Sequence, residues 1–361
     1  MVNTVDPAAP SLNTAPDVSW PQLERFTFTG RGSEYFRIWI VNLLLSIVTL
    51  GIYSAWAKVR RTRYFYDNTH VAGASFEYHG NPKAILKGRV IALVGIIAYK
   101  VAFRVSPTVG FITFAVLAAL FPWLIWKSYQ FKLYNSSYRG IRFGFRGNLG
   151  QVYKTYLLWP VLCLFTFYTL VPFAYQRIKK FLHSESRYGT THFSFDATVG
   201  AYYRTYLIGF VVTAIVYVVM FKLFGGPFFA SMKHAKTAAP RFADILPFIL
   251  ILYVGIFLVA PLFLTMLQNL EWNGTRLGEH EFQSELKLPN MYFILITNLL
   301  GIIVTCGLFI PFAQIRLMKY RIEAMALNTY SSMDEFCADN EPTGSAVGEG
   351  VSDLLDFDLS L

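Results

Sequence analysis

Seven long apolar runs dominate the chain, and short polar segments rich in Lys and Arg separate them. No Asp, Glu, Lys or Arg interrupts six of these runs, and the seventh contains only Lys100; the runs are residues 38–57, 90–103, 105–126, 155–176, 205–221, 245–270 and 288–315. About 20 apolar residues form a helix that spans a hydrocarbon core ~30 Å thick. Membrane barrel strands are shorter and alternate in polarity. The pattern therefore predicts an all-α polytopic membrane protein of about seven hydrophobic helices.

Composition agrees with a membrane protein, and charge separates the ends of the chain from its middle. Hydrophobic residues make up 54% of the chain and charged residues 15%, with a mean hydropathy of +0.41, whereas soluble domains carry about 25% charged residues. The net charge is +10, yet residues 328–361 contain eight acids and no Lys or Arg. We expect disordered tails at 1–24 and 328–361 around a membrane domain at 25–327, with the run 38–57 directing insertion.

Internal similarity divides the membrane domain into units. Residues 41–60 match residues 297–316 at an offset of 256, and the identical pairs include Asn42/Asn298, Thr49/Thr305, Gly51/Gly307 and Arg60/Arg316. Phenylalanines in short alternating segments recur near the start of each unit, at Phe26, Phe76, Phe143, Phe193 and Phe282. The spacing predicts five repeats: 26–75, 76–142, 143–192, 193–281 and 282–327.

Each unit has the same expected order of elements. The Phe-x-Phe segment predicts a short strand outside the bilayer, because alternate residues face one way. An apolar helix follows, a Thr-x-Gly break interrupts it, and a helix with aromatic and basic residues restarts after Ala or Pro. That second helix is typical of the membrane interface, where aromatic rings and cations meet lipid headgroups.

The segment 49–69, TLGIYSAWAKVRRTRYFYDNT, together with SFEYHG at 75–80, resembles the YjgN-like family of bacterial inner-membrane proteins of unknown function. The resemblance covers about residues 25–330. The family commonly has proline before the tryptophan, where this chain has Ala55, although Pro172 and Pro311 occupy the equivalent place in later units. The resemblance implies a multi-pass protein of the bacterial inner membrane and implies no activity.

Two topologies remain open. If every run crosses, Lys and Arg divide 20 to 12 between the two sides, and units one and two become inverted relative to units three and four, as in secondary transporters. If units one, three and five are re-entrant, the division is 26 to 6, which the positive-inside rule favours. The distance from Arg37 to Lys58, 21 residues or about 31 Å as a helix, fits one crossing. We therefore expect all runs to cross.

Two groups of residues are candidates for function. Polar groups inside apolar runs are candidates for ligand contacts or for the repeat interface; they are Asn42, Asn298, Thr49, Gly51, Thr305 and Gly307. The basic and aromatic residues that recur in register are candidates for lipid headgroups; they are Trp56, Lys58, Arg60, Arg63, Tyr64, Arg177, Lys180, Arg316 and Lys319.

The sequence favours transport of a small molecule or lipid, by a transporter or channel. The alternative is a non-transporting envelope protein that organises lipids through its basic and aromatic helices. We expect anionic membrane lipids as partners, no nucleic acid, no metal ion, no cofactor and no enzyme activity, because no metal-ligand spacing, phosphate loop or nucleophile motif is present. A homo-oligomer stays open.

Overall fold

The computed structural model describes residues 21–234, 242–333 and 336. The strands are β1 Gln22–Arg25, β2 Thr27–Phe28, β3 Thr69–Val71, β4 Ala74–Tyr78, β5 Ser136–Tyr138, β6 Ile141–Phe145, β7 Ser186–Tyr188, β8 Thr191–Phe195, β9 Thr275–Leu277, β10 His280–Ser284 and β11 Met325–Thr329. The helices are α1 Gly32–Val48, α2 Ser54–Asp67, α3 Pro82–Val105, α4 Pro107–Tyr134, α5 Leu149–Tyr153, α6 Trp159–Phe165, α7 Val171–Glu185, α8 Val199–His234, α9 Phe242–Asn273, α10 Leu288–Val304 and α11 Ile310–Glu323, with a π-helical turn, Lys154–Leu158, joining α5 to α6.

All eleven described strands belong to one antiparallel sheet that closes almost completely on itself. Its order is β1-β11-β10-β9-β8-β7-β6-β5-β4-β3-β2, and only Phe26 separates the two edge strands, β1 and β2, in sequence. The backbone N–H of Phe26 donates to the Met325 carbonyl at 3.1 Å, which continues the ladder across this junction. Closure into a near-barrel leaves no long unpaired edge.

Tight turns join the strands of the hairpins. The β3–β4 turn consists of Ala72 and Gly73, and the β5–β6 turn consists of Arg139 and Gly140; all four residues have positive φ, between 44° and 78°. Two-residue turns with positive φ at both positions match the right-handed twist of the strands, and glycine adopts this backbone without steric cost. These turns fix the register that directs one set of side chains toward the axis of the near-barrel.

The expected all-α fold with seven spanning helices is wrong. The sheet has eleven strands, and among the described residues three helical segments are long and apolar enough to cross a membrane: Pro107–Tyr134, Val199–Leu223 and Ile249–Asn273. Each strand has only two to five residues, so its partners come from distant parts of the chain, which apolar run length does not reveal. The runs of units one, three and five are also interrupted.

Those three runs fold back as helical hairpins. After α1, Thr49 ends the helix, Gly51 adopts φ +89°, and α2 returns alongside, so that the Asn42 side chain reaches the Ala57 carbonyl at 3.5 Å. The α10–α11 hairpin repeats this path, with Gly307 at φ +94° and Asn298 donating to the Ala313 carbonyl at 3.1 Å. The expected single crossing of these runs is therefore wrong, and the re-entrant alternative matches the path of the chain.

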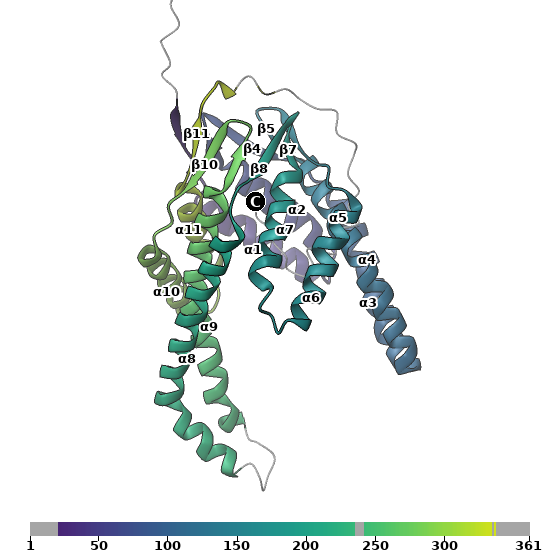
Figure 1. Cartoon of the computed structure of the whole chain (residues 1–361), viewed down its shortest axis with the longest axis vertical. Coiled ribbons are helices and arrows are strands. Elements are labelled where there is room, and N and C mark those ends of the chain that lie inside the picture. Colours follow the sequence, from purple (N-terminus) through teal and green to yellow (C-terminus); the bar gives the residue numbers. More distant parts are fainter. Residues whose placement is uncertain (1–20, 235–241, 334–335, 337–361) are drawn as a thin grey trace, which may run out of the picture.

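Every helical hairpin leaves the sheet on the same side. Figure 1 shows the strands gathered at one end, with α3–α4 and α8–α9 extending furthest from them and the short hairpins staying closer to the strands. The expected inversion of units one and two relative to units three and four is accordingly absent from the described chain. The expected tails fall mostly outside the described residues, although β1 and β11 include residues 22–25 and 325–329.

Candidate functional site

A closed ring of five phenylalanines surrounds the axis of the near-barrel. The ring consists of the residues that begin the five units, Phe26, Phe76, Phe143, Phe193 and Phe282. The last four are each the third residue of the second strand of a hairpin, and Phe26 lies at the junction of β1 and β2. Neighbouring ring centroids lie 6.2–6.4 Å apart, with interplanar angles of 10–33°. The five aromatic rings therefore lie side by side around the axis with their planes nearly parallel.

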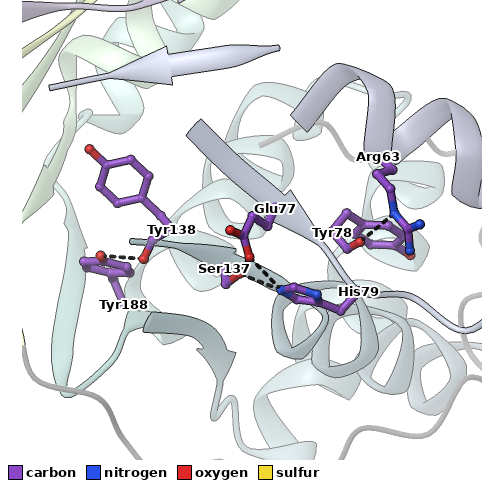
Figure 2. Close-up of polar contacts among 7 residues, drawn as sticks. All are labelled: Arg63, Glu77, Tyr78, His79, Ser137, Tyr138 and Tyr188. Carbon is purple, nitrogen blue, oxygen red and sulfur yellow. Dashed lines mark hydrogen bonds and ion pairs between the residues drawn. The ribbon is translucent and has the colours of Figure 1, made fainter. Parts of the chain in front are cut away.

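A second ring of side chains lies directly opposite the phenylalanines across the strand pairs. Phe76 is in register with Tyr138, Phe143 with Tyr188, Phe193 with Leu277 and Phe282 with Leu327. These partners and Val71 form one buried cluster. The Tyr138 hydroxyl donates to the Val71 carbonyl at 2.7 Å, and the Tyr188 hydroxyl donates to the Tyr138 carbonyl at 2.9 Å, a bond drawn in Figure 2. These bonds link consecutive hairpins around the axis.

The two rings line a partly open cavity of about 250 Å³ that continues down to the ends of α2, α4, α7, α9 and α11. Its wall is mainly aromatic and aliphatic, with Trp272, Phe65 and Met318 supplied by the helices.

The polar groups in the wall already have partners within the protein. The hydroxyls of Ser136 and Ser186 donate to helix carbonyls four residues earlier, at 2.8 and 2.7 Å. The Gln268 side chain accepts from Arg321 Nε at 2.6 Å and donates to the Arg321 carbonyl at 3.1 Å. The cavity therefore offers little unmet hydrogen-bonding capacity to an occupant.

His183 is the titratable imidazole in this wall, and it is held neutral. Its Nδ1 lies 3.2 Å from the Thr275 hydroxyl, and its ring stacks on Phe195 with centroids 5.0 Å apart. Burial, with a smaller contribution from the Lys179 charge, lowers the pKa of His183 to about 3. Lys179 itself forms a half-buried ion pair with Glu271, 2.9 Å between Nζ and Oε2, which joins α7 to α9. At neutral pH the imidazole adds no charge to the cavity.

The predicted intramembrane asparagines lie away from this cavity, inside the short hairpins. Asn298 is buried; its amide donates to the Ala313 carbonyl and its Oδ1 accepts from Arg316 at 2.8 Å. Asn42 makes the equivalent but longer contacts, with Arg60 Nη1 3.4 Å from its Oδ1. Each asparagine–arginine pair ties the first helix of a hairpin to the second. We interpret this contact as structural, since both ends of the amide are occupied.

The predicted threonines and glycines shape the hairpin tips. The Thr49 hydroxyl donates to the Leu45 carbonyl at 2.7 Å and accepts from the Tyr53 N–H at 2.9 Å, and Thr305 does the same between Gly301 and Phe309. Gly51 and Gly307 follow with left-handed backbones. The tips carry strongly exposed apolar side chains: Leu50 is 94% exposed, Phe167 89% and Val304 81%. Such tips require an apolar environment.

The predicted headgroup residues fall into two groups. Some bind within the protein: the Tyr64 hydroxyl donates to the Arg31 carbonyl at 3.0 Å, and Arg63 donates to the Tyr78 carbonyl at 3.4 Å (Figure 2). Trp56 stacks on Tyr53, and Arg177 lies over Phe173. The others are lysines at or near the surface: Lys180 is exposed, Lys319 is exposed and forms an ion pair with Glu323 at 3.7 Å, and Lys58 is half-buried. These cations lie on α7, α11 and α2, the helices that return to the sheet.

A family model matches residues 23–354, described as a bacterial protein of unknown function (DUF898). The chain belongs to this family. It is also similar to the inner membrane protein YjgN of Salmonella typhimurium strain LT2, 31% identical over 145 residues, and of Escherichia coli O157:H7, 34% identical over 143 residues. The matched regions are 40% and 38% of this chain and 37% and 35% of those relatives, so they span little more than a third of each relative's length. No solved structure matches the chain.

Membership of the family confirms the resemblance seen in the sequence, and with the three apolar helices it confirms that the chain is a bacterial inner-membrane protein. The sequence did not predict the cavity of this DUF898 protein. The signal was the phenylalanine at the start of each unit, which marked the repeats but did not show that the units surround one axis. Among the described residues no cluster of metal-binding side chains occurs.

Proposed function

We propose that this inner-membrane protein organises anionic lipids at the cytoplasmic surface and does not transport a solute. One observation supports this proposal most directly: the sheet and the returning basic helices α2, α7 and α11 lie at one end of the molecule, while the hairpin tips are apolar. Cations on these helices can therefore meet phosphates from one leaflet while the tips enter the hydrocarbon.

Charge distribution supports a cytoplasmic position for the sheet. Within the described residues, 26 Lys and Arg residues lie on the sheet side, whereas Lys100, Arg104, Lys222 and Lys233 lie toward the far ends of the long hairpins. Cytoplasmic segments of membrane proteins carry such an excess of Lys and Arg. The same cations suit anionic lipid rather than nucleic acid as partner, and the proposal assigns no enzyme activity and no cofactor.

We also propose that the five units are diverged repeats. The support is geometric, because the residue that begins each unit occupies one place in the phenylalanine ring. The same support speaks against transport by inverted repeats, since five units in one ring share one orientation relative to the sheet. A scaffold that presents several similar basic helices to one leaflet needs that shared orientation.

The test compares two charge-matched triple variants. Lys58→Gln, Lys180→Gln and Lys319→Gln remove cations on the sheet side, whereas Lys100→Gln, Arg104→Gln and Lys222→Gln remove three at the far ends of the long hairpins. The delipidated full chain in neutral detergent is titrated with phosphatidylglycerol and with phosphatidylethanolamine at low salt. Each surface cation contributes about 1 kcal/mol, so the first triple should weaken phosphatidylglycerol binding roughly a hundredfold.

The control triple should bind phosphatidylglycerol within about twofold of the parent chain, and raised salt should shrink the difference between the triples because it screens exposed charges. Equal losses in both triples, or no loss in the first, would exclude recognition by the returning helices. Binding of phosphatidylethanolamine should change little in either triple.

A further inference from the structure

We propose that the axial cavity binds one hydrocarbon chain of a membrane lipid, which lies along the axis against the ring of phenylalanines. The site is separate from the exposed cations, so it goes beyond the headgroup contacts proposed above and rests only on the membrane location of the chain. The ligand class is the uncharged acyl or isoprenoid part of a lipid, whatever its headgroup.

The chemistry of the wall selects an apolar occupant. Phe26, Phe143 and Phe282 belong to a ring of five aromatic side chains, and the serine, glutamine and histidine groups beside them already bind within the protein. An occupant that requires hydrogen bonds would lose its water and find few replacements. A hydrocarbon chain loses nothing of this kind and contacts aromatic carbon on all sides.

The size and shape of the cavity fit a chain end. An apolar cavity of about 150 Å³ holds benzene, and this one has about 250 Å³ and is lined by side chains from all parts of the near-barrel. A thin, flexible chain can follow the axis of the near-barrel, which a broad planar molecule cannot do.

We infer that the occupant enters the cavity from its helix end, which is the end nearer the membrane. At the turn end of the hairpins, Met333 lines the cavity and Phe336 packs on Tyr188, with ring centroids 5.0 Å apart. At the other end the wall is formed by helix ends, and those helices lead toward the apolar hairpin tips. Hydrocarbon chains are the most abundant apolar groups in that direction, which identifies a lipid as the source.

The experiment uses the full chain in vesicles of zwitterionic phosphatidylcholine that contain a phosphatidylcholine with a diazirine at the end of one acyl chain. After irradiation, the labelled peptides are mapped by mass spectrometry. We expect adducts on peptides that contain Trp272 and Phe282 in addition to the outward faces of α3 and α4. Adducts confined to the outward faces would overturn the proposal.

Two cavity-filling variants sharpen the result. Val71→Phe and Ser186→Leu each add carbon atoms to a different part of the wall, and each should reduce cavity adducts at least fivefold without changing those on α4. The matched control is Ala197→Leu, a buried position in a cluster that shares no residue with the cavity wall, which should leave cavity labelling unchanged in the folded fraction collected by size exclusion. Cavity adducts that survive both fillings would contradict the proposal.

Two further outcomes distinguish binding of a lipid chain in the cavity from headgroup binding and from occupation by the protein's own C-terminal residues. Labelling of the cavity should persist in the Lys58, Lys180 and Lys319 triple variant, so failure of headgroup recognition and failure of chain binding are read independently. If labelling occurs only after residues 337–361 are removed, the cavity holds part of the chain's own tail and the lipid proposal fails.

Discussion

The short hairpins and the long hairpins begin with similar apolar helices but end differently. In the short hairpin α1–α2, a five-residue connection with Gly51 at φ +89° leads into a basic helix, and an asparagine–arginine pair ties the two helices. In the long hairpin α3–α4, only Ser106 separates the helices; it accepts from the Thr108 N–H at 3.2 Å and Pro107 starts the next helix. Both helices of the long hairpins are apolar through most of their length.

Helix contacts differ in the same way. A side chain added at Gly209 would meet Phe263, and one added at Gly255 would meet Tyr217, so the long helices α8 and α9 pack closely through glycine. Small residues at such crossings are typical of membrane-spanning pairs. The comparison shows that two features decide whether an apolar run crosses the membrane or turns back: the residues at its turn, and an asparagine–arginine pair that links its two helices. Hydropathy alone does not separate the two cases.

The largest expected effect is the side of the membrane from which single cysteines are labelled, since each position should react from one side only. In a cysteine-free background, Ser75→Cys and Ser194→Cys should be labelled from the same side of the inner membrane, because β4 and β8 belong to one sheet. Ser106→Cys, at the far end of a long hairpin, should be labelled from the opposite side. Side-specific thiol reagents on cells and inverted vesicles make the measurement. Labelling of Ser75→Cys and Ser194→Cys from opposite sides would show that the α6–α7 hairpin crosses.

The next largest effect is on stability, when the asparagines that link the two helices of a short hairpin are replaced. Asn298→Leu removes two good hydrogen bonds and leaves Arg316 without its amide partner, so it should lower the free energy of unfolding by about 2–3 kcal/mol. Asn42→Leu should cost only about 1 kcal/mol, because its contacts are longer. Thermal unfolding in detergent tests both. The exposed Asn290→Leu on the same helix is the control, expected within about 0.5 kcal/mol. Equal costs at Asn42 and Asn298 would contradict the ranking.

The smallest effect has opposite signs in the two kinds of hairpin. Gly51→Ala should destabilise by about 1 kcal/mol, because its left-handed backbone disfavours a Cβ although the space around it is open. Gly95→Ala should be neutral or stabilise by up to about 1 kcal/mol, since it lies within α3 and its Cβ would meet Leu117 at an ordinary 3.6 Å. Unfolding midpoints compare the two. The same sign at both positions would mean that the tip of α1–α2 does not need its left-handed turn.

Sequence reasoning succeeded where the signal was local. The sequence shows the apolar runs, the positive charge, the recurrent phenylalanines and the Thr-x-Gly breaks directly. The family and the membrane location inferred from it are confirmed. The sequence shows the break at Thr49 and Gly51, but the length from Arg37 to Lys58 fits one membrane crossing if the helix is unbroken. The helix is broken, because the chain reverses between Asn42 and Arg60 and brings these two side chains into contact.

By itself the sequence determined that this chain enters a membrane, where its apolar runs lie, and which residues recur in each unit. These properties depend on side-chain polarity and on neighbours a few residues apart. Only the tertiary structure decided the closed sheet, the ring from Phe26 to Phe282 and the cavity inside it. Strands of two to five residues have no stable partner nearby in sequence, so their pairing depends on bringing all five units around one axis.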